Sequence, residues 1–343
     1  MGLLVVTGVL RTKQFWPEAR SDADTATVDL VPQAKKPFVF VNNAGQRKTT
    51  KVFDNAVVLG KFGPNAVVNQ PKTSTVRRVT VRLQGIDAPE LHFQPQVPGA
   101  GGKGIIHPFR QSLGETSANA LHDIVAAIGL VEIPCEVVTV VNTPNEVCDV
   151  YGRIVGNLVL TLGSVRIDLN QRLLREGWVL PGLYNSMSKP EIQAVLADHQ
   201  MAKQNKRGLF SRKIVTTKLA PFDDQRRERK GPTSFKPFSD EGPVNFPKFF
   251  RRQAELHVRT ANGETVPADL RAFIKTKKDD LAMATSKFLA LKGPTTGAKA
   301  KAKFDNLATF LGGNKYPMGP EVVFFENDSL LVKAGTTTPI KDW

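Results

Sequence analysis

Cysteine is scarce in this chain, which contains only Cys135 and Cys148 among its 343 residues. Two cysteines are too few for a disulfide framework, and their spacing is not that of a metal site. One bridge between the two stays an open alternative. Histidine adds no metal signal, because four of the five histidines lack the spacing of ligands and His92 is more typical of a loop residue without a chemical role.

Long apolar runs are absent as well. No stretch approaches the roughly 20 consecutive apolar residues that a membrane-spanning helix requires. The first residues, Met1 to Val6, lack the basic segment, the long apolar run and the cleavage site of a signal peptide, and they are typical of a strand. We therefore expect a protein without membrane contact that is located in the cytoplasm.

Acidic residues are few compared with basic ones. Lys and Arg number 47 against 32 Asp and Glu, which gives a formal net charge of +15. A field of this sign concentrates polyanions, so nucleic acid is the leading partner class. The alternative is that the charge only keeps the protein soluble. A hydrophobic fraction of 41% with 23% charged residues is typical of a folded globular protein.

The length of the chain favours about two domains. The first is expected at residues 1–211, with an insertion or a long hairpin at about 32–75 that is rich in Asn, Gly, Pro and Lys. Residues 212–245 are rich in Pro, Lys, Arg and Asp without periodicity, which is typical of a basic, Pro-rich linker. Residues 246–343 then form the second domain.

Hydrophobic periodicity predicts the elements of the first domain. Strands are expected at residues 1–10, 26–31, 76–83, 132–141 and 154–161. Three helices are expected to end at Gly129, Gly177 and Gly208, and the third opens with a capping box from Ser188 to Glu191. Strands followed by interleaved helices indicate a small β-barrel with helices packed on it.

The second domain is expected to be a small α+β unit. A hairpin is predicted around Ala261-Asn262-Gly263, followed by three short helical patterns, and a closing hairpin is predicted from residues 322–325 and 330–332. Nothing in this segment indicates a function. Substrate recognition, contact with a protein partner and targeting are all open.

One group of charged residues has the composition of a phosphodiester-cleaving site. An apolar strand delivers Arg82, and the turn after it carries Asp87 and Glu90. Asp22 and Asp24 add carboxylates upstream, and Arg153 follows downstream. Carboxylates can hold a hard divalent cation and orient water, whereas guanidinium groups stabilise charge on phosphate oxygens.

This group resembles the signature of the staphylococcal nuclease (thermonuclease) family. The resemblance rests on the run Arg82 to Glu90, on Asp22-Ala23-Asp24-Thr25 and on Tyr151-Gly152-Arg153, which occur in the family's order. It covers residues from about 1 to 211. The fold that it implies is an α+β fold, an OB-fold-type barrel with packed helices, here followed by the small α+β C-terminal domain.

The resemblance also implies roles for these residues. Asp24 and Asp87 would ligate Ca²⁺ together with the carbonyl oxygen of Ala88. Glu90 would be the general base that activates water. Arg82 and Arg153 would bind the phosphate. Weaker candidates for contact with nucleic acid are Tyr151, Tyr184 and Asp22.

The implied activity is that of a calcium-dependent endonuclease acting on DNA or RNA and leaving 3′-phosphate ends. The alternative is a nuclease-like module that is catalytically weak or inactive and binds nucleic acid or a protein partner. Retention of the carboxylates favours the enzyme, because carboxylates repel phosphate unless a metal is present.

Three departures from the family pattern bear on the site. Ala23 replaces the glycine of Asp-Gly-Asp-Thr, and it would be strained if that position needs a positive φ angle. The 32–75 segment is far longer than the family's connection and could cover the substrate groove or project from it. Val150 stands where relatives often carry a basic residue, so one phosphate contact is expected to be missing.

Overall fold

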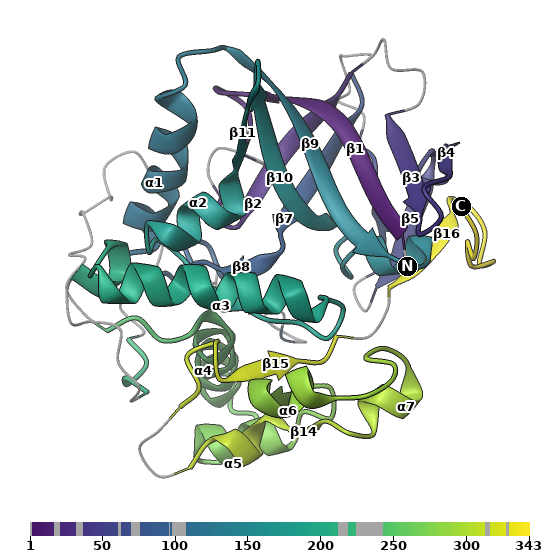
Figure 1. Cartoon of the computed structure of the whole chain (residues 1–343). Coiled ribbons are helices and arrows are strands. Elements are labelled where there is room, and N and C mark those ends of the chain that lie inside the picture. Colours follow the sequence, from purple (N-terminus) through teal and green to yellow (C-terminus); the bar gives the residue numbers. More distant parts are fainter. Residues whose placement is uncertain are drawn as a thin grey trace.

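The computed structural model describes most of the chain, in eleven segments: 2–16, 21–31, 37–60, 63–69, 76–95, 97, 108–211, 219–223, 243–312, 316–326 and 329–343. Most of the linker predicted at 212–245 and parts of the predicted insertion therefore lie outside the described residues. Figure 1 shows a barrel, helices beside and below it, and a C-terminal unit beneath the helices.

A closed barrel of five strands forms the centre of the first 211 residues. Its strands are β1 (Gly2–Arg11), β2 (Thr25–Leu30), β7 (Arg78–Leu83), β9 (Glu132–Val141) and β10 (Ile154–Leu162). β1 pairs with β2 and β9, β2 pairs with β7, and β10 closes the ring by pairing with β7 in parallel and with β9. The fold predicted for this part of the chain is confirmed.

The barrel is filled by alternate residues of its strands. In β7, Val79, Val81 and Leu83 are fully buried, whereas Arg78, Thr80 and Arg82 face the other side and are partly buried. This alternation follows from the two-residue period of a strand. Each fully buried valine or leucine contributes about 1.5 to 3 kcal/mol through the water it excludes. The same packing fixes the side of the sheet from which Arg82 projects.

Three helices and several short elements support the barrel. The helices are α1 (Gly114–Ala126), α2 (Leu169–Arg175) and α3 (Lys189–Gln204). Short elements complete this part: β8 (Gly85–Asp87), β11 (Val165–Asp168), β12 (Leu180–Gly182), η1 (Pro144–Val147) and η2 (Gly208–Ser211). The predicted capping box is present, since Ser188 accepts from the amide of Glu191 and Glu191 accepts from the amide of Ser188.

The described part of the predicted insertion forms four strands, namely β3 (Phe38–Asn42), β4 (Arg47–Thr50), β5 (Ala56–Gly60) and β6 (Gly63–Ala66). β3 pairs with β1 and so extends the barrel sheet, and β4 pairs with β3. β5 pairs with β6 on one side and with the C-terminal strand β16 (Leu330–Lys333) on the other. The end of the chain therefore returns to the barrel side of the molecule (Figure 1).

The C-terminal unit mixes helices with short strands. Its remaining elements are α4 (Pro247–Ala261), α5 (Leu270–Lys275), β13 (Leu281–Ala284), α6 (Thr285–Ala290), α7 (Ala298–Lys301), β14 (Asp305–Asn306), η3 (Leu307–Phe310) and β15 (Val322–Phe324). Both hairpins predicted here are wrong. Residues 247–261 are helical, and β15 pairs with β13 rather than with β16.

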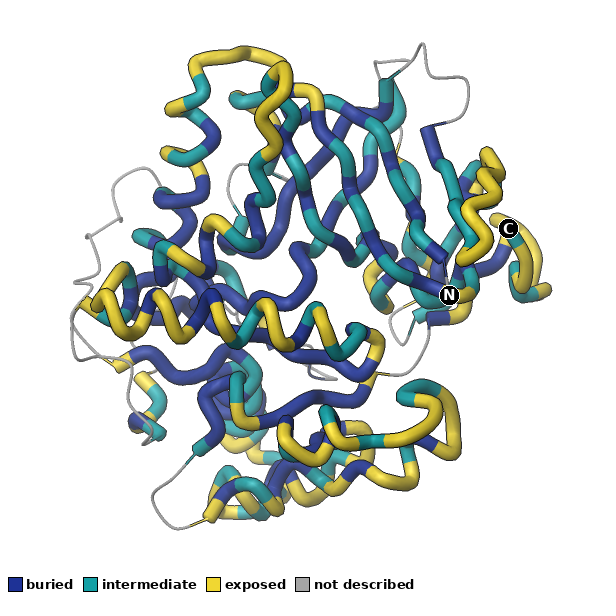
Figure 2. The backbone as a smooth tube through the Cα atoms, in the orientation of Figure 1, coloured by how far each residue is buried: buried dark blue, intermediate teal, exposed yellow. Residues whose placement is uncertain are grey.

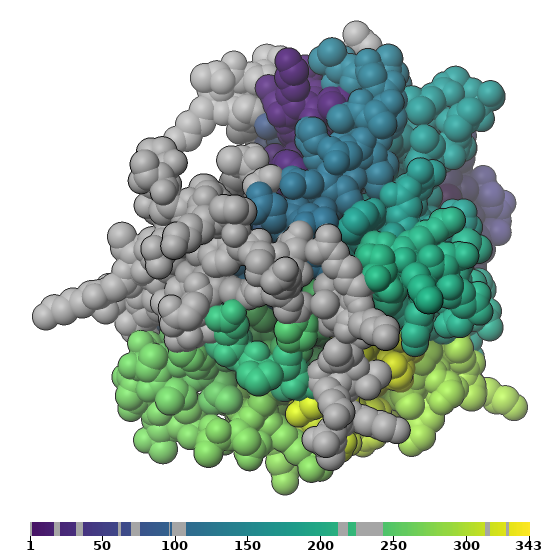
Figure 3. Space-filling view, turned by 90° about the vertical axis from the view of Figure 1, so that its left-hand side faces the viewer, coloured from purple at the N-terminus to yellow at the C-terminus, as the bar shows by residue number. Residues whose placement is uncertain are grey.

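The C-terminal unit is docked on the barrel part through shared apolar clusters. Phe246, Phe249 and Phe324 pack in one cluster with Leu180 and Tyr184. A second cluster joins residues of α3 and of the segment after β12 to residues of β13, α6 and β15. A third cluster joins α4 to residues 97 and 109. Figure 2 shows that α4 and β15 are buried where they face the barrel part, and Figure 3 shows the C-terminal unit beneath it.

The structure also bears on the two cysteines and on the apolar character of the helices. Cys135 and Cys148 are both buried and free, so the bridge left open by the sequence is not formed. None of the helices in the described segments is long and apolar enough to cross a membrane.

Candidate active site

The predicted site residues meet because strand pairing brings their segments together. Thr25 of β2 is paired with Arg82 of β7, and Val155 of β10 is paired with Arg82 on the other side. Asp24 and Arg153, which directly precede β2 and β10, therefore flank the end of β7. After Leu83 the chain turns at Gly85, whose φ of 78° suits glycine, and β8 then delivers Asp87.

The turn that carries Glu90 is fixed from three sides. The Asp22 carboxylate accepts from the amide of Leu91 at 2.6 Å. Gln111 accepts from the amide of Glu90 at 2.9 Å through its side chain and donates to the Glu90 carbonyl at 2.8 Å through its backbone. Gly114 leaves room for that carbonyl, because a Cβ there would lie 2.5 Å from it. The acidic side chains are thus mounted on rigid backbone.

These carboxylates are buried, and burial changes their titration. Asp87 is fully buried, and Asp24 and Glu90 are 7% and 4% exposed. Burial raises the pKa of Glu90 well above its usual value and also raises that of Asp87, whereas the Arg251 guanidinium opposes both shifts. Burial together with the charge of Asp24 raises the pKa of Asp22 to about 6. Such a cluster is unfavourable unless a cation balances it.

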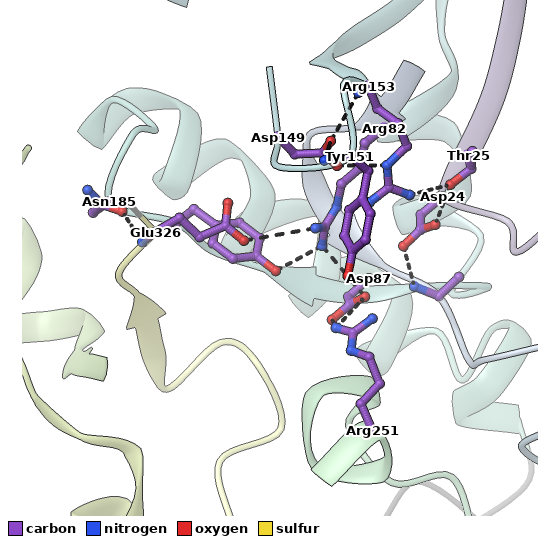
Figure 4. Close-up of polar contacts among 12 residues, drawn as sticks. Asp24, Thr25, Arg82, Asp87, Asp149, Tyr151, Arg153, Asn185, Arg251 and Glu326 are labelled. Carbon is purple, nitrogen blue, oxygen red and sulfur yellow. Dashed lines mark hydrogen bonds and ion pairs between the residues drawn. The ribbon is translucent and has the colours of Figure 1, made fainter. Parts of the chain in front are cut away.

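The balancing cation is Arg251, which comes from α4 of the C-terminal unit. Its Nη1 donates to Glu90 Oε1 at 2.5 Å, and its Nη2 donates to Asp87 Oδ2 at 3.0 Å. Figure 4 shows the guanidinium directly below Asp87, on a helix distinct from every element that carries the other charged groups. One guanidinium therefore bridges the two carboxylates that the resemblance assigns to metal binding and to catalysis.

Arg82 is held by partners on both sides of the groove. Its Nη2 donates to the Tyr184 hydroxyl at 2.8 Å and lies 3.9 Å from Asp87 Oδ1. Its Nη1 lies 3.9 Å from a carboxylate oxygen of Glu326, a residue of the C-terminal unit. Tyr184 is buried beneath Arg82, and burial raises the pKa of its hydroxyl, so the hydroxyl stays protonated and accepts from the guanidinium.

Arg153 is oriented by its own turn. Asp149 accepts from the Arg153 Nε at 2.7 Å and from the amides of Tyr151 and Arg153 at 2.9 and 3.0 Å. The Nη1 of Arg153 also donates to the Thr25 hydroxyl at 3.2 Å. The Arg153 guanidinium lies 5.4 Å from the centre of the half-exposed Tyr151 ring. Figure 4 shows Arg153 and Arg82 on the same side of the site.

A groove of about 760 Å³ opens over this cluster. One side, the barrel wall, includes Asp22, Asp24, Arg82, Glu90, Tyr151, Arg153 and Tyr184. The other side, the C-terminal wall, includes Lys248, Arg251, Arg252, Glu255, Lys277, Asp280 and Glu326. Seven acidic and seven basic side chains line the groove in total, so it carries no formal excess of positive charge although the chain as a whole is strongly basic.

The residues proposed to bind calcium can be tested by their surroundings. Asp24, Asp87 and the carbonyl of Ala88 supply hard oxygen donors, and one of them, Asp87, already accepts from a cation, the Arg251 guanidinium. The chemistry of the donors therefore fits a divalent cation. In the described segments, however, no group of three or more His, Cys, Asp or Glu side chains is arranged so that it could hold a metal ion.

A comparison with known families matches much of the barrel part of the chain. A family model described as staphylococcal nuclease homologue matches residues 80–212. The chain carries a staphylococcal nuclease-like domain. The match begins within β7 and covers Arg82, Asp87, Glu90 and Arg153, whereas Asp22 and Asp24 precede it and join the domain through the pairing of β2 with β7. A search of curated proteins finds no match.

The structure of the nuclease-like domain places all nine residues named from the sequence. Arg82, Asp87, Glu90, Asp24, Asp22 and Arg153 converge, and the Ala88 amide donates to Asp24 at 3.4 Å. Tyr151 lies at the edge of the groove, whereas Tyr184 is buried beneath Arg82. The sequence did not reveal Arg251 or Glu326, because neither belongs to a motif and both lie in a unit without a recognised pattern.

Two of the three departures from the family pattern also have structural answers. Ala23 is buried and is not among the non-glycine residues with positive φ, so its backbone carries no such strain. No described residue of the 32–75 segment lines the groove. Instead, Asn65 donates to the carbonyl of Val150, which supports the turn that carries Arg153 from outside.

Proposed function

We propose that this protein is a nuclease that hydrolyses phosphodiester bonds of DNA or RNA. The observation that carries the proposal is the convergence of Arg82, Glu90 and Arg153 on one groove, with Asp87 buried beside Arg82, within a staphylococcal nuclease-like domain. Two guanidinium groups and buried carboxylates on rigid strand ends are what displacement at phosphorus requires. Endonucleolytic cleavage is the mode that we propose, as the resemblance implies.

In this proposal each side chain acts on one part of the reaction. Glu90, whose pKa is raised by burial, takes the proton of the attacking water. Arg82 and Arg153 donate to the phosphate oxygens and stabilise the charge that develops there. Tyr184 and Asp149 position these two guanidinium groups. Loss of the 5′ oxygen from phosphorus leaves a 3′-phosphate end.

Calcium is the cofactor that we propose for this site. Asp24, Asp87 and the carbonyl oxygen of Ala88 would hold it, and when bound it would add positive charge next to the phosphate. Asp22 would remain a neighbour that fixes the turn through Leu91 rather than a ligand. Contact of Tyr151 with a base or sugar is proposed from its half-exposed position at the groove.

The test is digestion of single-stranded DNA, double-stranded DNA and RNA by the full chain, with calcium and with chelator. Glu90→Gln should abolish calcium-dependent cleavage, whereas Glu136→Gln, an exchange at a partly exposed carboxylate paired with Arg166 outside the groove, should retain it. End labelling then determines whether the products carry 3′-phosphate. Absence of cleavage under every condition would remove the proposal.

A second candidate is a catalytically weak module that binds nucleic acid or a protein partner. The observation that favours it is the pairing of Glu90 and Asp87 with Arg251, which withdraws both carboxylates from water and metal. Electrophoretic mobility shift of labelled DNA and RNA distinguishes the two. Binding without cleavage, at calcium concentrations that saturate the site, favours the module.

A further inference from the structure

The C-terminal unit places opposite charges against both halves of the candidate site. Arg251 contacts the acidic half, Asp87 and Glu90, and Glu326 faces Arg82 in the basic half at 3.9 Å. The two contacts come from different elements of the unit, α4 and the segment after β15, so one local turn does not explain them. The groove is thus neutralised from within the chain at the positions that a cation and a phosphate would take.

The position of Arg251 is imposed by the packing of α4. The two residues before it, Phe249 and Phe250, are buried in two different apolar clusters that join the C-terminal unit to the barrel part. Lys248, Arg251, Arg252 and Glu255 line the groove from the opposite face of the helix, as the 3.6-residue period requires. Docking of the unit therefore delivers the guanidinium to the carboxylates.

A guanidinium and a divalent cation cannot share these oxygens. Both Asp87 and Glu90 are almost inaccessible, and Arg251 already donates to each of them. A second cation beside it would be repelled in a poorly solvated place. The Arg251 side chain is 25% exposed and lies on the groove, so it has an aqueous space into which it can move.

We propose that Arg251 is an internal competitor of the metal, which holds the nuclease-like site in a self-paired state until a divalent cation displaces it. The inference rests on the proposed metal-dependent function. The guanidinium and the metal compete for the same carboxylates, so a protein without the Arg251 guanidinium should bind the metal more tightly. Glu326 competes in a similar way with the substrate, because its carboxylate faces Arg82 where a phosphate would bind.

Isothermal titration of the metal-free full chain with calcium chloride tests the proposal. Arg251→Ala should bind calcium about 10- to 100-fold more tightly than the unchanged protein, the range typical of coupling between two ligands. Arg251→Met, which retains the aliphatic part of the side chain and loses its charge, should do the same and covers the case in which alanine impairs folding. Arg259→Ala is the matched control, because this arginine of the same helix pairs with Glu255 and Glu264 and does not line the groove.

Thermal unfolding gives a readout that is independent of cleavage. Without calcium the Arg251 variants should unfold at a lower temperature, since Asp87 and Glu90 lose their cation, and calcium should restore more of this loss than it adds to the unchanged protein. Equal or weaker calcium affinity in both Arg251 variants than in the unchanged protein overturns the proposal. Tighter calcium binding without cleavage by any variant leaves the proposal standing and removes the nuclease function instead.

Discussion

The two walls of the groove are built in different ways. The barrel wall takes its charged groups from strand ends and turns whose positions follow from local pattern, with Thr25, Arg82 and Val155 aligned by strand pairing. The C-terminal wall takes them from a helix and a loop that reach the site only through docking, and Arg251 lies 161 residues after Glu90. The barrel wall carries the chemistry expected of the family, whereas the C-terminal wall supplies counter-charges to it.

The difference explains how much could be predicted from the sequence. The alternation of Val79, Val81 and Leu83 identifies β7 and places Arg82 outside the core, because the period of a strand is a local property. Gly177 and the Ser188 cap likewise mark helix ends by local backbone chemistry. The fold of the barrel part and the convergence of its site residues follow from such signals and from the resemblance.

Prediction fails where the partner of a segment is distant. Asn262 and Gly263 have the composition of a hairpin turn, but they end α4, where Gly263 adopts a φ of 73° as a helix-terminating glycine. Strands near 322–325 and 330–332 do form, yet they pair with β13 and β5, because strand pairing is decided by tertiary packing. Arg251 was missed for the same reason.

The largest expected effect breaks the chemistry of the barrel wall. Arg82→Lys removes the planar fork that donates to Tyr184 and is proposed to bind the phosphate, so kcat for nucleic-acid cleavage should fall by about 100- to 1,000-fold, or about 3 to 4 kcal/mol. Steady-state cleavage with a fluorescent oligonucleotide measures it. Arg78→Lys is the control, because Arg78 lies on the same strand and pairs with Asp29. A fall in kcat of less than tenfold would mean that groups other than Arg82 bind the phosphate.

The next effect concerns the integrity of the C-terminal wall. Asp280 is 2% exposed and accepts from Arg252 Nε at 2.5 Å and Nη2 at 2.6 Å. Asp280→Asn removes the nearer of the two carboxylates that pair with the partly buried Arg252 guanidinium, and it should lower the free energy of unfolding by about 3 kcal/mol. Urea denaturation followed by circular dichroism measures it. The neighbouring exchange Asp279→Asn, at a side chain that is 81% exposed, should cost less than about 1 kcal/mol; equal losses would mean that burial of the pair is unimportant.

A pH effect of similar size is expected on α3, which lies between the barrel and the C-terminal unit. His199 is 7% exposed and packs against Phe210, and burial lowers its pKa from 6.5 to about 4. Between pH 6.5 and 4, His199 therefore binds a proton in the unfolded chain but not in the folded chain. Stability that is complete above pH 6.5 should be lost as the pH falls toward 4, by about 2 to 3 kcal/mol.

Denaturation curves at several pH values isolate this contribution when the unchanged protein is compared with His199→Leu. The variant has no proton to bind, so the difference between the two stabilities should change between pH 6.5 and 4 and stay constant above pH 6.5. His122→Leu is a suitable control, because the His122 side chain on α1 is about half exposed. Parallel pH profiles for unchanged protein and His199→Leu would show that His199 is not protonated differently in the two states.

The smallest expected effect returns to a feature that the sequence predicted alone. Ser188→Ala removes the side-chain oxygen that accepts from the Glu191 amide at the start of α3, and the free energy of unfolding should fall by about 1 kcal/mol. Because the first turns of α3 carry Ile192, which packs with Phe288 and Val323 of the C-terminal unit, fraying there also loosens the docking that delivers Arg251. Hydrogen exchange should accordingly accelerate at the amide of Glu191 and in α6. If exchange accelerates only at residues 189–192, the Ser188 cap does not affect the docking of the C-terminal unit. The position of the C-terminal wall would then depend on its own ion pairs.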